Sequence, residues 1–279
     1  MIKKACYRKK NLMLMLSGLL LLLFALPVSA MEKPLSQSQS ELTCEGDLPS
    51  TCAESSLMDL AVDAALEESG SQLALLPAQA VSGSLDQGAI FQSDLERIIA
   101  DDQPLVLAEL SPAELKEMLE TGVSKLTKDN ADKIDVSASA WEGFPHMAGG
   151  EGFSWEYDVS APVGERVQYI KVNGEELDLT DEESKFTVCS VPAMFDGSLG
   201  YSPVDYQESE LTLRQALHDY CAAQESIEKP ASRCNVIGSG DYTLISRFPK
   251  SVIIAICVFI SLFVCIPKWR AEKYFSFKK

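Results

Sequence analysis

The stretch PLVLAELSPAELKEMLETG, residues 104–122, places a strand signal directly before a helix signal. Residues 104–110 form a short, mostly apolar run, which is typical of a buried β-strand. Residues 111–122 follow without a loop and carry the end signals of a helix. The stretch therefore predicts a strand that runs straight into a helix, and the fold class follows from how often this pattern recurs.

The ends of the predicted helix are marked by residues that prefer those positions. Ser111 can cap the N-terminus, Pro112 fits the first helical position, and Glu114 completes a capping box with Ser111. Gly122 is expected to end the helix, because glycine readily adopts the left-handed conformation that follows many helices.

Segments on both sides of this stretch repeat such signals. Helices are predicted at residues 55–70, 93–100 and 211–224, and strands at residues 73–76, 152–159, 166–172 and 185–192. The pair Asn173-Gly174 is a hairpin signal, and Phe153, Trp155 and Tyr157 alternate onto one face of their strand. Two helix–strand blocks and an antiparallel β block predict an α/β (α+β) domain over residues 55–228.

The N-terminus has the three parts of a secretory signal peptide. Five basic residues lie among the first ten, a leucine-rich uncharged run follows, and Val28-Ser29-Ala30 matches a small-x-small cleavage site. We expect residues 1–30 to be a signal peptide that is cut after Ala30. An uncleaved membrane anchor is the alternative.

The C-terminal part contains a candidate membrane span. Residues 251–267 are uncharged but slightly fewer than the ~20 that cross a bilayer comfortably, and flanking lysines can extend the span. Residues 268–279 form a basic tail, which belongs on the cytoplasmic side. We expect a single-pass plasma-membrane protein with residues 31–250 outside the cell. Residues 229–250 would form its juxtamembrane segment.

The outward-facing part of the chain is strongly acidic. Residues 31–250 hold 14 basic and 40 acidic side chains, a net charge of −26, whereas the whole chain carries −17. Such a surface repels nucleic acid and anionic membranes, so nucleic-acid binding is excluded as a function. Free nucleotides would also be repelled unless a local basic site overcame the field.

Four cysteines of the outward-facing part can form two disulfides, which are stable outside the cytosol. Cys44 and Cys52 flank a short polar loop within residues 31–54, a segment whose composition is that of a linker. Cys221 and Cys234 can pair across the end of the last helix. The chain has no CxxC pair, which argues against a zinc site.

Four segments carry a family resemblance when they are taken in order: LVLAELSPAELKEMLETGV (105–123), MAGGEGFSWEYD (147–158), GERVQYIKVNGEELD (164–178) and KFTVCSVPAMFDGSLGYSP (185–203). They are similar to the strand–helix unit, the strand ending in YD, the hairpin, and the strand and GGDGY loop of the 5′-nucleotidase C-terminal domain. This family includes bacterial UDP-sugar hydrolases and animal ecto-5′-nucleotidase. The resemblance covers roughly residues 57–227. It implies a layered helix–sheet–sheet–helix domain that binds the base and ribose of a nucleotide.

In that family the chemistry takes place on a preceding dimetal phosphoesterase domain. Only 26 residues separate the expected cleavage site from Leu57, and the chain has two histidines, His146 and His218. A dimetal centre needs several histidine and carboxylate ligands, and the family motifs DxH, GDxxD and GNHD are missing from the sequence. We therefore expect no catalytic residue, no metal site and no cofactor in this chain.

The resemblance also indicates where a nucleotide would bind. The family stacks the base between two aromatic rings and holds the ribose and phosphate with arginine. The corresponding arginine segment here is residues 77–83, with Ser82 near the arginine position. The segment of the first aromatic ring is residues 100–103, where Asp101 and Asp102 stand instead.

The second aromatic segment is the loop FDGSLGYSP, residues 195–203. Gly197, Gly200 and Tyr201 match the family loop, whereas the aspartate of the motif is lost. Tyr201 is predicted to contact a ligand and the glycines to shape the turn. Asp205 is predicted to meet a ribose hydroxyl, with a surface acid as the alternative. One lost aromatic stack and one lost arginine contact remove ~2.5–6 kcal/mol, so the nucleotide site is expected to be degenerate.

Three functions fit these observations. The first is a membrane-tethered, catalytically incomplete domain that binds a nucleotide, a nucleoside or another small ligand. The second is an accessory subunit of a separate metallophosphoesterase chain, the two together forming a split nucleotidase. The third is a structural or adhesive surface module that kept the scaffold and lost the ligand.

Overall fold

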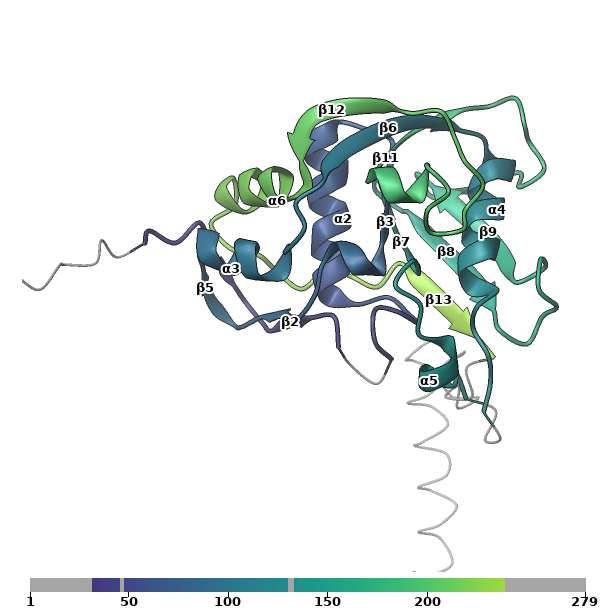
Figure 1. The fold of residues 1–279 in the computed structure, drawn as a ribbon, viewed down its shortest axis with the longest axis horizontal. Coiled ribbons are helices and arrows are strands. Elements are labelled where there is room, and N and C mark those ends of the chain that lie inside the picture. The colour runs from purple at the N-terminus through teal and green to yellow at the C-terminus, as the bar shows by residue number, and fades with distance from the viewer. Residues whose placement is uncertain (1–31, 46–47, 130–132, 239–279) are drawn as a thin grey trace, which may run out of the picture. The chain divides into compact units, whose positions relative to one another are not determined.

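The computed structural model describes residues 32–45, 48–129 and 133–238 (Figure 1), and the folded unit begins at Leu35. The predicted signal peptide, membrane span and basic tail lie outside the described residues. Among the helices of the described residues, none combines the length and the apolar character needed to cross a membrane.

Helices and strands alternate along the described chain, which confirms a mixed α/β fold. The helices are α2 (Ser56–Ser69), α3 (Gln92–Ile98), α4 (Pro112–Val123), α5 (Val136–Ser139) and α6 (Leu213–Ala222), with two short 3₁₀ turns, η1 (Ala78–Ala80) and η2 (Pro192–Met194). The predicted layer order of helix, sheet, sheet and helix stays a prediction.

The larger sheet has the strand order β12-β6-β11-β3-β7. Its strands are β3 (Leu73–Pro77), β6 (Pro104–Leu110), β7 (Pro145–Gly149), β11 (Phe186–Ser190) and β12 (Gln207–Thr212). The pair β11 and β3 is parallel and the other neighbours are antiparallel. Helix α2 packs against β3, β7 and α6, and Figure 1 shows α2 crossing behind β6.

A second sheet has the order β10-β9-β8-β13, with β8 (Ser154–Asp158), β9 (Val167–Val172), β10 (Glu175–Glu176) and β13 (Cys234–Ile237). The predicted hairpin joins β9 to β10, because Asn173 and Gly174 both adopt positive φ angles, 55° and 79°. The alternating aromatic side chains of β8 are buried as predicted, with Trp155 2% and Tyr157 0% exposed.

The predicted strand–helix unit is present at residues 104–123. The Ser111 hydroxyl accepts from the Glu114 amide at 3.2 Å, and the Glu114 carboxylate accepts from the Ser111 amide at 2.7 Å. These bonds satisfy amide groups that the first helical turn leaves unpaired. The helix does not end at Gly122, however. A Cβ atom at this position would lie 2.4 Å from Cδ of Pro145, so glycine is needed for close packing against β7.

The segment predicted as a linker is part of the folded unit. Residues Ser36–Ser38 form β1, which pairs with β5 (Gly88–Ile90), and Leu42–Thr43 form β2, which pairs with β4 (Ser84–Leu85). Leu42 is fully buried. The polar composition concealed these short strands, because only a few of their side chains face the core.

The predicted juxtamembrane segment also enters the fold. β13 pairs in parallel with β8 and is held by a group of polar contacts that we call the Arg233 clamp. The Arg233 guanidinium lies 2.6 Å from the Asp63 carboxylate and 3.9 Å from that of Asp59, both on α2. The Glu54 carboxylate accepts the backbone N–H groups of Arg233 and Cys234.

Neither predicted disulfide is present, since all the cysteines of the described residues are free. The Sγ atoms of Cys44 and Cys52 face different carbonyls, those of Val81 and Val136. Cys221 lies in α6, which packs against α2, and Cys234 lies in β13, which pairs with β8. Burial raises the pKa of the Cys44 thiol to about 11 and that of Cys221 to about 12, so both thiols stay protonated.

Candidate functional site

The end of β3 and the start of β6 enclose a small hollow, which we call the strand-end cavity. Its volume is about 180 Å³, and it is lined by Pro77, Gln79, Ala80, Asp101, Gln103, Val191 and Leu213. The structure thus brings together residues 77–83 and 100–103. These are the two segments in which the sequence places the arginine and the first aromatic ring of a nucleotide site.

Backbone hydrogen bonds fix the wall of the cavity that η1 forms. The Ala78 amide donates to the Phe144 carbonyl at 2.9 Å, and the Gln79 amide donates to the Glu142 carbonyl at 2.8 Å. The side chain of Gln79 remains exposed. The cavity therefore presents the Gln79 amide group from a backbone that is hydrogen-bonded to residues 142–144.

Asp102 fixes the opposite wall. Its carboxylate accepts hydrogen bonds from the Arg214 amide and the Thr212 hydroxyl, both at 3.0 Å, and lies 3.5 Å from the Arg214 guanidinium. Arg214 also donates to the Ile99 carbonyl at 2.7 Å. Asp102 therefore holds the N-terminus of α6, and the charge of Arg214 is already paired.

The lining of the strand-end cavity does not match a nucleotide. Its hydrogen-bonding side chains are Gln79, Asp101 and Gln103, and no lysine, arginine or aromatic ring among the described residues lines it. The Gln103 amide donates to the Asp101 carboxylate at 2.8 Å. A carboxylate repels phosphate, and the volume lies below the ~300–1,000 Å³ of usual ligand pockets. A small ligand that donates hydrogen bonds fits this chemistry better.

Tyr201, predicted to contact a ligand, is a core residue in the structure. Its side chain is 3% exposed, and its hydroxyl donates to the Gly143 carbonyl at 2.8 Å. Its ring centre lies 5.4 Å from that of Trp141, and burial raises the pKa of Tyr201 above its ordinary value. The face that would stack on a base is covered by Trp141, so the geometry corrects the expected role.

The glycines of the same loop shape a turn, as the sequence predicts. Gly197 and Gly200 both have a φ of 83°, a conformation that side chains other than glycine rarely adopt. The Gly200 amide donates to the Gly197 carbonyl at 3.0 Å, and the Ser198 amide to the Asp196 carboxylate at 2.7 Å. The loop is therefore closed by its own hydrogen bonds.

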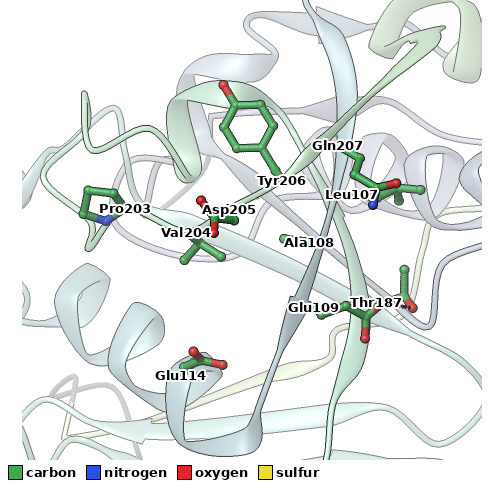
Figure 2. Close-up of a pocket in the computed structure, with 10 residues that line it drawn as sticks. All are labelled: Leu107, Ala108, Glu109, Glu114, Thr187, Pro203, Val204, Asp205, Tyr206 and Gln207. Carbon is green, nitrogen blue, oxygen red and sulfur yellow. Dashed lines mark hydrogen bonds between the residues drawn. The ribbon is translucent and has the colours of Figure 1, made fainter.

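Asp205 lies apart from the strand-end cavity, in a larger hollow that we call the β6 groove (Figure 2). Its volume is about 590 Å³, and it is lined by Leu107, Ala108, Glu109, Glu114, Thr187, Pro203, Val204, Asp205, Tyr206 and Gln207. The four predicted site residues thus separate into the core, a turn and this groove, and none of them lines the strand-end cavity. Gln79 and Gln103 were missed, because amide side chains in short turns carry no motif of their own.

A comparison with protein families shows to which family this chain belongs. The profile of the 5′-nucleotidase, C-terminal domain family matches residues 37–205, which is more than half of the chain. This chain belongs to that family. This membership agrees with the four sequence segments that resemble the family. No significant match is found among the curated proteins.

Solved structures share the fold of this 5′-nucleotidase C-terminal domain. A 5′-nucleotidase precursor of Thermus thermophilus has a TM-score of 0.60 at 22% identity, over 78% of this chain and 42% of that one. The NAD nucleotidase of Haemophilus influenzae has a TM-score of 0.59 at 14% identity, over 74% of this chain and 38% of that one. A sulfate thiohydrolase of Thermus thermophilus, in complex with glycerol, has a TM-score of 0.52 at 20% identity, over 74% of this chain and 35% of that one. This chain therefore spans about two-fifths of the length of these proteins.

The histidines of the domain take structural positions. His146 is 2% exposed with Nε2 2.8 Å from the Ser50 carbonyl, and burial lowers its pKa to about 4. His218 lies on α6, 2.8 Å from the Asp219 carboxylate. Within the described residues, no group of three or more His, Cys, Asp or Glu side chains could hold a metal ion.

Proposed function

We propose that this 5′-nucleotidase C-terminal domain is a non-catalytic binding module that no longer holds nucleotides in the manner of its family. We further propose that residues 251–267 hold it at the outer face of the plasma membrane. The observation that carries the proposal is the lining of the strand-end cavity, with one carboxylate and two amides. A cation for phosphate and a ring for a base would each have to come from residues other than those that line the cavity.

The charges around the cavity support the exclusion of phosphate. Asp101 lines the cavity, and Asp102 beside it already uses the nearby guanidinium of Arg214. A ligand with a phosphate group would therefore meet repulsion without a compensating contact. A neutral ligand with hydroxyl or amine donors would instead find the acceptor oxygens of Asp101, Gln79 and Gln103.

Calorimetry on the full chain in detergent tests this proposal. We expect AMP to bind no better than adenosine, because the phosphate gains nothing in this cavity. The double variant Ser82→Arg/Asp101→Asn should improve AMP affinity by roughly 10- to 100-fold, the effect of one charge-assisted hydrogen bond. Glu67→Gln, in a different hollow, is the matched control and should change nothing. Binding of AMP to the wild type with a Kd below ~100 μM would contradict the proposal. Metal-dependent hydrolysis of AMP or UDP-sugars would contradict it as well.

A split enzyme is a second candidate. The domain keeps its family fold, with a TM-score of 0.60 to a nucleotidase of which it spans 42%, so a separate metallophosphoesterase chain could supply the remaining part. Joint purification of the two chains and a gain in hydrolysis over the partner alone would favour this function. A structural or adhesive module would show neither a partner enzyme nor any small ligand by calorimetry.

A further inference from the structure

The β6 groove has a shape set by the way β12 leaves the sheet. β12 pairs with β6 at Gln207 opposite Leu107 and at Glu208 opposite Val106. Residues 203–206, which precede β12, turn away from β6 instead of continuing the pairing. In Figure 2 these residues form one side of an open space, and β6 forms the other.

Contacts with Phe195 hold residues 203–206 in this position. The Val204 amide donates to the Phe195 carbonyl at 2.8 Å, and the Tyr206 ring lies 6.3 Å from the Phe195 ring. Phe195 itself is fully buried. The groove is therefore kept open by the core rather than by a mobile loop.

One edge of β6 is left without a strand partner along this groove. Ala108, Glu109 and Leu110 pair with β11 on their other side, opposite Val188, Thr187 and Phe186. Within the described residues, no strand is paired with them on the β12 side. Since backbone groups of an antiparallel strand point alternately to its two neighbours, some N–H and C=O groups of 108–110 face the groove.

The walls of the groove are acidic. Glu109, Glu114 and Asp205 line it and come from β6, α4 and the segment before β12, respectively. Lys185 pairs with Glu114 at 2.7 Å, and this contact with the capping of α4 lowers the pKa of Glu114. The Glu109 carboxylate accepts from the Thr187 hydroxyl at 2.7 Å. The exposed Asp205 carboxylate has no hydrogen-bond partner in the described part of the chain.

We propose that the β6 groove docks an extended, lysine- or arginine-bearing segment of a partner protein. The unpaired edge of β6 supplies main-chain hydrogen bonds, as in other cases where a peptide adds a strand to a sheet. The carboxylates of Glu109 and Asp205 select positive side chains, whereas that of Glu114 is already paired with Lys185. Leu107, Ala108 and Val204 accept the aliphatic stems of these side chains. The groove and the strand-end cavity share no lining residue, so this docking is independent of any small ligand.

Peptide binding to the full chain in neutral detergent tests the proposal. The probe is a labelled six-residue peptide of alternating lysine and valine with blocked ends, followed by fluorescence anisotropy at low and high salt. We expect it to bind at low salt, and a matched peptide with glutamate in place of lysine not to bind. Equal binding of the two peptides, or no binding of the lysine peptide, would overturn the proposal.

Variants locate the binding in the groove. Glu109→Gln keeps an acceptor for Thr187, and Asp205→Asn keeps the size of the side chain. The double variant should weaken the lysine peptide by about three- to tenfold, the effect of losing two exposed ion pairs. Glu67→Gln, which lies in another hollow, should leave the affinity unchanged. An unchanged affinity in the double variant would place the peptide elsewhere.

Hydrogen exchange distinguishes a peptide that is bound as an added β-strand from polycations that bind the groove by charge alone. The lysine peptide should slow the exchange of amides within residues 108–110, whereas the polyamine spermine should not. If spermine displaced the peptide and the peptide protected none of these amides, the groove would be a site for small polycations, and strand docking would be wrong.

Discussion

His146 shows how one buried side chain makes the stability of this protein depend on pH. Its Nε2 atom donates to the Ser50 carbonyl, and its Nδ1 atom is buried without a partner in the described residues. Burial lowers the pKa of His146 from 6.5 to about 4. Because the unfolded chain takes up a proton at a higher pH than the folded one, this residue costs stability as the pH falls below 6.5.

The variant His146→Gln should remove this cost. Between pH 7.5 and pH 5, the free energy of unfolding of the wild type should fall by about 2 kcal/mol relative to that of the variant. Urea unfolding followed by tryptophan fluorescence at the two pH values measures the difference. An equal change in the two proteins would show that His146 is protonated when folded.

Gly122 is a second residue whose role comes from its surroundings. A methyl group there would lie 2.4 Å from Cδ and 2.5 Å from Cγ of Pro145. Gly122→Ala should lower the free energy of unfolding by about 1–3 kcal/mol, the usual cost of overfilling a core, although alanine favours helix. Thr121→Ala, at the neighbouring and more exposed position, is the control for helix propensity. A stabilised Gly122→Ala variant would mean that α4 and β7 can move apart.

At the scale of the element, the Arg233 clamp joins α2 to β13. Asp59 is 4% exposed, and burial together with the nearby Glu54 carboxylate raises its pKa from 3.8 to about 8. Between pH 4 and pH 8, Asp59 therefore keeps its proton in the folded state, whereas the same carboxyl group is ionised in the unfolded chain. The stability due to this proton is complete below pH 4 and is lost as the pH rises through 8.

Asp59→Asn should make the clamp insensitive to pH in this range. From pH 6 to pH 8 the wild type should lose about 2–3 kcal/mol of unfolding free energy that the variant keeps. Thermal or urea unfolding at both pH values checks this, with the exposed Asp86→Asn as the control. Parallel pH profiles for the wild type and Asp59→Asn would show that Arg233 keeps Asp59 ionised.

The elements differ in how well the sequence predicts them. The strand and helix of residues 104–123 are predictable because their signals are local: an apolar run, a capping box and a proline at the first turn. β1 and β13 are not, since each has three or four residues and exists only because a distant strand pairs with it. The same reason explains why residues 31–54 read as a linker.

At the scale of the whole molecule, the family and the mixed α/β fold follow from the order of the segments, but the site does not. Sequence reasoning identifies the two segments that meet at the strand-end cavity. It cannot tell that Tyr201 faces Trp141, because a ring beside glycines looks the same whether it is covered or exposed. The β6 groove depends on residues 203–206 leaving β6, which is a matter of packing on Phe195.

The parallel pairing of β13 with β8 has a mechanical consequence. β13 is the last described strand and pairs only with β8 among the described residues. A pull on its C-terminal end along the strand axis would load the hydrogen bonds of this pair together, in shear, rather than opening them one after another. The Arg233 guanidinium, at the other end of β13, would resist the same pull through Asp63. Single-molecule stretching from the C-terminus should therefore meet its first resistance at this strand.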